Sequence, residues 1–281
     1  MLLPCIPSEI TDRIIALLWP DMAALRCCTM VCRRWLPASR YQLFMELNLR
    51  NHIAYDLLVS NILHSDEARS SLMATHRIIL DESRVLNLDT KSERCAAMRA
   101  HRFSHDFAGH LPGLRDLELR GVEWDLDIVV PHSSVHLAFT RFNSVRRLVL
   151  HRVNFPTFGL ARRLLSALRS LESLVVSETF ARPEQAAGIS PVATRRPQRP
   201  ALTSLELAGV MNERFVDCLV HFLCRTPTSS SLRVLRLSSE RPRQSDGVPS
   251  ESSGSVFESL GSCVETLALR DDHAGDGDNP I

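Results

Sequence analysis

A pattern of apolar residues, L-x-x-L-x-L, recurs over residues 80–270 of the chain. Full or valine-substituted copies begin at Leu114, Val145, Leu171, Leu202, Leu232 and Val264, and a weaker copy precedes them at Leu86-x-Leu88. The central apolar positions of neighbouring copies are separated by 26 to 32 residues. Because alternate side chains of a strand point to opposite faces, each copy predicts a short, half-buried strand with polar residues such as Glu118, Glu206 and Arg236 pointing outward.

Between these predicted strands the apolar spacing changes to that of helices. Leu160 to Leu168 has apolar residues on one helical face, and Phe215 to Leu223 has the same spacing, with Asn212 as a candidate N-cap. Strand, turn and helix repeated about every 30 residues predict an α/β solenoid, in which each unit buries its apolar face against the next unit.

The first 45 residues have a different pattern and predict two or three short helices. Pro7 suits the start of a helix, and Ile10 and Ile14 begin an apolar stripe that ends before Pro20. Asp21 is placed to cap the next helix, which ends before Pro37. About 40 residues are too few for a self-sufficient core, so the surplus apolar surface needs cover from the rest of the chain or from a partner.

The segments Ile6-Pro7-x-Glu9-Ile10 and Val31-Cys32-Arg33-Arg34-Trp35, in this order and spacing, resemble the two ends of an F-box. The resemblance covers residues 3–45, and the end of the segment is similar to the F-boxes of large fungal families. It implies docking on the Skp adaptor of a Skp–cullin–F-box ubiquitin ligase. The positions carried over as adaptor-binding or supporting residues are Pro7, Ile10, Ile14, Leu25, Cys28, Val31, Cys32 and Trp35. The alternative is a helical cap on the domain that follows.

The repeated strands over residues 80–270 resemble a leucine-rich repeat of a long, irregular kind. Where that family has an Asn or Cys ladder, this chain has Val122, Val153 and Val210. An ordinary α/β domain with leucine-rich strands is the alternative. The expected organisation is therefore an F-box at 3–45, a helical connector at 46–79, the repeats at 80–270 with inserted loops at 181–200 and 238–255, and a disordered tail at 271–281.

Composition and charge narrow the function classes. The 33 basic and 32 acidic residues give a formal net charge of +1, which provides no general attraction to nucleic acid or to an anionic membrane. The apolar runs are too short to span a bilayer, and Glu9, Asp12 and Arg13 interrupt the N-terminal run, so no signal peptide is predicted. Eight scattered cysteines suit a reducing compartment, and we expect a cytoplasmic or nuclear protein, or both.

Candidate chemistry is sparse. Cys27, Cys28 and Cys32 cluster without a second pair at zinc-site spacing, and His101 and His105 lie on a stretch whose Phe103 and Phe107 indicate an ordinary amphipathic helix. We expect no catalytic residues, no metal and no cofactor, because no phosphate loop, nucleophile elbow or kinase signature occurs in the sequence. A nucleic-acid-binding array and an enzyme are the weaker rival hypotheses.

The resemblances together imply a substrate receptor that holds an unknown target protein on its repeats and reaches a cullin through the Skp adaptor. An F-box and repeat scaffold acting outside ubiquitin transfer is the alternative function. The sequence does not identify the substrate-binding residues; candidates flank the strand leucines and are Arg115, Glu118, Arg120, Arg146, Arg147, Glu206 and Arg236. Lys91 is the single lysine, which leads to the hypothesis that the receptor limits its own ubiquitination.

Overall fold

Three short helices open the part of the chain that the computed structural model describes, which comprises residues 6–63, 65–84, 100–124, 135–181, 200–209, 212–238 and 264–270. They are α1 (Ser8–Leu17), α2 (Met22–Val31) and α3 (Leu36–Met45). Pro7 directly precedes α1, and the Asp21 carboxylate caps α2 by accepting hydrogen bonds from the backbone N–H groups of Ala23 and Ala24, both at 2.9 Å. The predicted helical N-terminus is confirmed.

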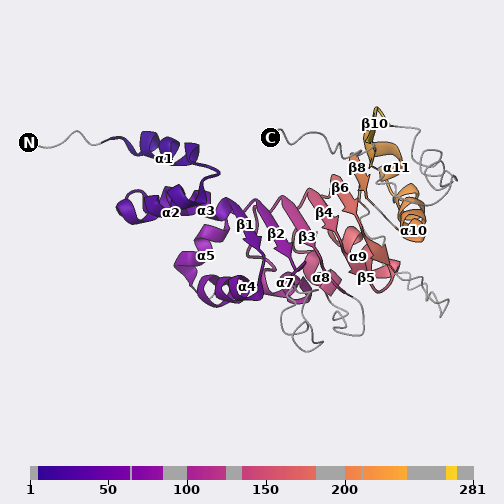
Figure 1. The fold of residues 1–281 in the computed structure, drawn as a ribbon, viewed down its shortest axis with the longest axis horizontal. Coiled ribbons are helices and arrows are strands. Elements are labelled where there is room, and N and C mark those ends of the chain that lie inside the picture. Colours follow the sequence, from indigo (N-terminus) through magenta and orange to yellow (C-terminus); the bar gives the residue numbers. More distant parts are fainter. Residues whose placement is uncertain are drawn as a thin grey trace, which may run out of the picture.

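A parallel sheet follows, and its strands lie side by side in the order in which the chain forms them (Figure 1). The eight strands are β1 (Glu46–Leu49), β2 (Arg77–Asp81), β3 (Asp116–Arg120), β4 (Arg147–His151), β6 (Ser173–Ser177), β8 (Ser204–Ala208), β9 (Val234–Ser238) and β10 (Thr266–Arg270). Every pairing within this sheet is parallel. A second, two-stranded sheet pairs β5 (Asn154–Phe155) with β7 (Phe180–Ala181).

Helices connect the strands and lie along one side of the large sheet (Figure 1). They are α4 (His52–Leu58), the π-helix η1 (Val59–Leu63), α5 (Asp66–Leu72), α7 (Ala100–Asp106), α8 (Val135–Phe139), α9 (Phe158–Ala167), α10 (Glu213–Cys224) and α11 (Thr228–Ser231). The helices predicted around Leu160–Leu168 and Phe215–Leu223 are α9 and α10. Asn212 caps α10 as predicted, since its side chain accepts from the Phe215 N–H at 3.3 Å.

The core lies between the sheet and these helices, because the alternate leucines of the central strands point toward the helical side. Leu117, Leu148, Leu174 and Leu205 are in register on neighbouring strands and are fully buried. A second buried row, two residues further along each strand, comprises Leu80, Leu119, Leu150, Val176 and Leu207. Aromatic rings from the helices fill the space against these rows; Phe103, for example, stacks on Phe142 with a centroid distance of 5.6 Å.

A left-handed backbone residue ends four of the strands at the same place. Gly121 follows β3 and Gly209 follows β8, while Arg152 follows β4 and Glu178 follows β6, all with positive φ. Their N–H groups continue the ladder between strands in three cases, as when the Arg152 N–H donates to the Ser177 carbonyl at 3.0 Å. The recurrence of the leucine pattern is therefore matched by recurrence of the backbone turn that follows it.

Six of the seven predicted strand centres, from Leu117 to Leu267, lie in strands, which confirms the strand prediction there. The seventh, at Leu86, lies outside the described residues. Residues 46–79, expected to be a helical connector, contain helices but begin on β1 and end within β2. The pattern was present in both strands, as Phe44-x-x-Leu47-x-Leu49 and Thr75-x-x-Ile78-x-Leu80, with Phe and Thr in place of the leading leucine.

The α/β class is confirmed by this mostly parallel sheet with its connecting helices. The inserted loops are described only at their ends: Phe180–Ala181 belongs to β7, and Ser238 ends β9. Residues 182–199, 239–263 and the tail 271–281 lie outside the described part.

Candidate functional site

Exposed apolar side chains on the N-terminal helices form one candidate site. On α1, Ile10, Ile14 and Leu17 are spaced at i, i+4 and i+7, and their exposed fractions are 53%, 45% and 70%. At the end of α2, Met30 and Val31 are also exposed. Large apolar side chains at this spacing form one stripe along a helix, and such a stripe on the surface is typical of an interaction site.

Buried residues beneath this surface hold the helices together. Ile15, Leu25 and Cys28 are buried between α1, α2 and α3. Trp35 is half-buried at the start of α3, where its carbonyl accepts from the Ser39 N–H at 3.0 Å and from the Ser39 hydroxyl at 2.8 Å. The Trp35 N–H donates to the Cys32 carbonyl at 3.2 Å, which closes the turn between α2 and α3 directly after Val31.

The structure divides the eight predicted adaptor-binding residues into two groups. Those that are exposed and available for contact are Pro7, Ile10, Ile14, Val31 and Cys32. Leu25 and Cys28 are buried and support the surface, and Trp35 is intermediate. The predicted adaptor-binding set omits Leu17 and Met30, which are 70% and 80% exposed. Leu17 belongs to the apolar stripe that helical spacing from Ile10 and Ile14 predicts, whereas no sequence signal indicated Met30.

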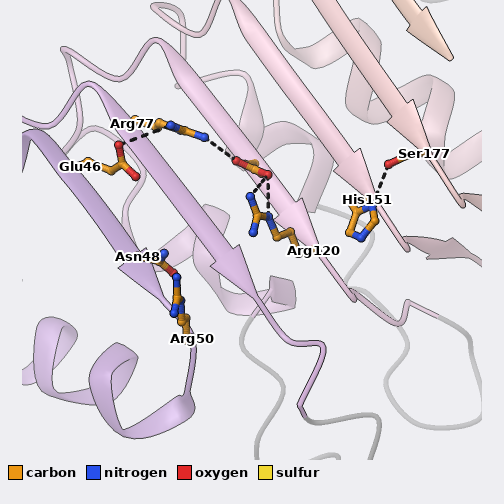
Figure 2. Close-up of polar contacts among 8 residues, drawn as sticks. Glu46, Asn48, Arg50, Arg77, Arg120, His151 and Ser177 are labelled. Carbon is orange, nitrogen blue, oxygen red and sulfur yellow. Dashed lines mark hydrogen bonds and ion pairs between the residues drawn. The ribbon is translucent and has the colours of Figure 1, made fainter. Parts of the chain in front are cut away.

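The second candidate site is the sheet face opposite the helices, here called the open face, where polar side chains of neighbouring strands are linked. Arg77 on β2 donates to Glu46 of β1 at 3.4 Å and to Glu118 of β3 at 2.9 Å (Figure 2). Arg120, two residues along β3, donates to the other oxygen of Glu118 at 2.6 Å. The hydrogen bond to Glu118 raises the pKa of the Arg77 guanidinium, so Arg77 stays charged.

Glu118 was expected from the sequence to point outward from the sheet, and the structure adds that other side chains cover it there. It does lie on the open face, but it is only 6% exposed because Arg77 and Arg120 cover it. Each of its two oxygens accepts from a charged donor. Glu118 therefore fixes β2 to β3 and has little capacity left for a ligand.

The other candidate residues on or beside the open face are partly paired as well. Arg236 on β9 lies 3.7 Å from Glu206 on β8, and Arg146 lies 2.9 Å from Glu172, which precedes β6. Arg115 and Arg147 differ from these: both are exposed, and neither forms an ion pair within the part of the chain that the structure describes. They are the two uncompensated cations among the seven sequence candidates.

A serine and a histidine, which sequence reasoning did not connect, come together on β4 and β6. The Ser177 hydroxyl is 2.8 Å from His151 Nδ1 (Figure 2). A catalytic histidine also needs a group that orients its second ring nitrogen. Within the described ranges His151 has no hydrogen bond to such a group, so the pair lacks the third member of a nucleophilic triad.

The candidate metal-binding residues do not assemble into a site. Cys28 is buried while Cys27 and Cys32 are exposed, so the three thiols do not face one point. His101 and His105 lie on α7, whose Phe103 is buried in the core together with Phe107 just beyond its end, as the amphipathic interpretation predicts. The described residues contain no group of three or more His, Cys, Asp or Glu side chains arranged to hold a metal ion.

The chain matches no protein-family model, and the curated proteins contain no significant sequence match to it. Within the described ranges, every helix is too short or too polar to cross a membrane.

Proposed function

We propose that the chain is the substrate-recognition subunit of a Skp–cullin–F-box ubiquitin ligase. Residues 3–45 act as an F-box that docks on the Skp adaptor, and the repeats hold a target protein. The observation that carries the proposal is the exposed stripe of Ile10, Ile14 and Leu17 on α1, because these side chains need an apolar partner.

Two further features of the N-terminal helices support adaptor docking. Pro7, Ile10, Val31 and Cys32, which match the F-box pattern, are exposed, whereas a plain helical cap would turn its apolar side chains toward the domain that it covers. Buried residues of the same pattern, Leu25 and Cys28, support the surface from below. This division between contact and support is what a docking module requires.

The arrangement of the sheet supports a repeat solenoid as the target-holding part. Its strands follow chain order, all pair in parallel, and place the same leucine positions in register. The left-handed residue after the strand also recurs, at Gly121, Arg152, Glu178 and Gly209. Units related in this way stack upon their neighbours and present an extended surface to a partner.

The proposed mechanism is proximity, with the catalytic groups on other subunits. By binding the adaptor at one end and the target at the other, the receptor raises the local concentration of a target lysine near a ubiquitin-charged enzyme. The chain itself performs no chemistry. Lys91, its single lysine, lies outside the described residues and stays the subject of the self-modification hypothesis.

The alternative is an adaptor-bound scaffold outside ubiquitin transfer. It makes the same contact through residues 3–45 but assembles without a cullin. The composition of the purified complex separates the two functions: a cullin present in stoichiometric amount supports the ligase, and its absence from an intact adaptor complex supports the scaffold.

The test is co-purification of the full chain with the Skp adaptor, comparing two charge-matched variants. Ile10→Glu/Val31→Glu places two carboxylates in the proposed surface. Ile53→Glu/Leu57→Glu places two on the exposed face of α4, where Ile53 and Leu57 are 60% and 55% exposed. Because all four side chains are exposed, neither variant removes packing from the core.

We expect the wild-type chain and the α4 variant to bind the adaptor, and the Ile10→Glu/Val31→Glu variant to lose binding while its circular dichroism spectrum is unchanged. A folded wild-type chain that does not bind the adaptor would exclude the F-box. Equal loss in both variants would show that the contact does not involve this surface specifically.

A further inference from the structure

Acidic residues are missing from one central block of the chain. Residues 128–171 contain seven arginines and neither aspartate nor glutamate, although the whole chain has 32 acidic residues spread over 281 positions. The block includes α8, β4 and α9. Such segregation of one charge sign creates a local positive potential even though the net charge of the chain is +1.

Two of the seven arginines are neutralised by the next unit of the chain. Arg146 pairs with Glu172 at 2.9 Å, and Arg152 pairs with Glu178 at 2.7 Å. The remaining five are all exposed, and none forms an ion pair with any residue in the described ranges; they are Arg141, Arg147, Arg162, Arg163 and Arg169.

Three of these five arginines, with Arg115, lie at or shortly before the starts of neighbouring strands. Arg141 follows α8, Arg169 follows α9, Arg147 is the first residue of β4, and Arg115 directly precedes β3. The Arg115 carbonyl accepts from the Arg147 N–H at 3.0 Å, which places the two residues on adjacent strand entries. Arg115, Arg141, Arg147 and Arg169 are called the entry rim.

The entry rim spans the starts of β3, β4 and β6. Adjacent strands lie about 4.8 Å apart, so three strand entries cover about 10 Å. Asp116 and Glu172 border the rim, and Glu172 is already paired with Arg146. The acidic neighbours therefore do not neutralise all of the positive charge of the rim. Its width matches a short segment with a few carboxylate side chains.

We propose that the entry rim binds a short acidic segment of the target protein. The inference rests on the proposed function, and adds to it the chemical class of the target. Exposed arginines without intramolecular partners are free to form charge-assisted hydrogen bonds with carboxylates, in a bidentate geometry where the segment allows it.

An acidic protein segment fits this surface better than a nucleic acid does. Single-stranded nucleic acid is held by aromatic rings on which bases stack, in addition to cations. Phe139 at the end of α8 and Phe142 in the segment between α8 and β4 are the aromatic residues closest in sequence before the start of β4, and both are buried. Bordering carboxylates such as Asp116 also repel a continuous phosphate backbone but permit a short, separated run of acidic side chains.

Arg141 and Arg169 also contribute to the stability of the fold, and the test has to distinguish this contribution from ligand binding. Each follows the C-terminal end of a helix, where a positive charge interacts favourably with the helix dipole. Arg147 does not share this location, because it lies on the strand. Substitution by glutamine keeps the polarity and removes the charge, and it serves as the milder variant.

The experiment measures binding of the full chain to a fluorescein-labelled oligoglutamate peptide by anisotropy, with oligoglutamine as the uncharged comparison. The test variant is Arg147→Glu/Arg169→Glu, with Arg147→Gln/Arg169→Gln as its milder form. The matched control is Arg162→Glu/Arg163→Glu, which makes the same change in net charge on the exposed side of α9. Oligothymidylate carrying the same number of negative charges tests the nucleic-acid alternative.

We expect oligoglutamate to bind the wild-type chain with an affinity that decreases with salt. Binding should weaken about tenfold, which corresponds to about 1.4 kcal/mol, in the glutamate test variant and change little in the α9 control. Equal weakening in the test and control variants would overturn the entry rim as the site. Tighter binding of oligothymidylate than of oligoglutamate would overturn the acidic segment.

Adaptor co-purification of the same variants distinguishes this inference from the proposed function. A chain that binds the adaptor but not oligoglutamate contradicts the entry rim alone. A chain that binds oligoglutamate at the rim but not the adaptor contradicts the proposed function and leaves an acidic-segment binder.

Discussion

Arg152 and Glu178 occupy the same place in two neighbouring units and are joined by an ion pair of 2.7 Å between Arg152 Nε and Glu178 Oε2. Each directly follows a strand, and each has a positive φ, 55° and 47°. Two other units have glycine at this place, Gly121 and Gly209, which adopts the left-handed backbone without steric cost. The turn is thus set by its position in the repeat, and the side chains at that position vary.

The turn after β3 predicts that Gly121→Ala destabilises the protein strongly. Gly121 has φ +60°, and an added Cβ lies 2.5 Å from Ser83 Cα and 2.6 Å from Ser83 N, so the backbone around Ser83 must move. Backbone strain and overpacking together are expected to lower the free energy of unfolding by about 3 kcal/mol. Urea denaturation followed by circular dichroism measures this difference.

Gly109→Ala is the matched control for that substitution. Gly109 also has a positive φ, +84°, but an added Cβ meets no atom within 4 Å. Only the backbone strain remains, about 1 kcal/mol. If the two alanine variants have the same stability, the contact with Ser83 does not contribute and the account of Gly121 is incorrect.

Arg77 and Glu118 should be strongly coupled in a double-mutant cycle. The Glu118 side chain is 8% exposed and accepts from Arg77 and Arg120, so removal of Arg77 leaves a nearly buried carboxylate with fewer donors. A hydrogen bond to a charged group contributes about 1.5 to 3 kcal/mol to stability. Because the Arg77 side chain is 41% exposed, water screens its bond to Glu118 and reduces this contribution. We expect a coupling of about 1 kcal/mol from urea denaturation of the two alanine variants and their double variant.

Arg146 and Glu172 provide the comparison for this cycle, because they form an ion pair of the same length, 2.9 Å, in an exposed setting. Their side chains are 62% and 49% exposed, and water screens the pair. The expected coupling is less than about 0.5 kcal/mol. A coupling as large as that of Arg77 and Glu118 would mean that burial of the Glu118 carboxylate is not what strengthens its interactions.

Much of the fold was predictable, because the repeated leucine pattern indicates which side chains of each strand are buried. Leu117, Leu148 and Leu205 lie in strands since alternating apolar residues bury one face of a strand wherever helices cover it. The pattern is incomplete at β2, where Thr75 stands in the place of the leading leucine and the intervening Ile79 is apolar and buried as well. It is incomplete at β1, where Phe44 stands in that place.

The sequence predicted many residues of the candidate sites, but it did not predict how their side chains pair with one another. The F-box resemblance indicated Ile10, Ile14 and Val31, and the helical period of α1 extends the surface to Leu17. The sequence could not show which charged residues neutralise one another, because this depends on strand register. Glu118 is covered by Arg77, which is 41 positions away in the sequence, while Arg147 has no such partner among the described residues.

Tyr55 and Asp106 predict a specific stabilising link between α4 and α7. Tyr55 is 1% exposed, its ring packs edge-on against Phe107, and its hydroxyl donates to Asp106 Oδ2 at 2.7 Å. Tyr55→Phe keeps the ring packing but removes this bond to a charged acceptor, which should lower the free energy of unfolding by about 1 to 2 kcal/mol. Thermal denaturation measures the change, and Tyr41→Phe, at a residue that is 48% exposed, is the control expected to have little effect. An unchanged midpoint for Tyr55→Phe would indicate that water replaces the hydroxyl at Asp106.

Cys218 and Cys224 on α10 should differ in their reaction with iodoacetamide. Cys218 is exposed, whereas Cys224 is half-buried and packs against the core, and burial raises the pKa of the Cys224 thiol. A higher pKa leaves a smaller thiolate fraction at any pH below it, so alkylation of Cys224 should lag behind that of Cys218 near pH 8 and the difference should narrow as pH increases. Peptide mass spectrometry over time measures both rates, and the same reaction in concentrated urea is the control, where the two thiols should react alike. If the native protein alkylates Cys224 as fast as Cys218, then α10 opens at its C-terminal end faster than the reagent reacts.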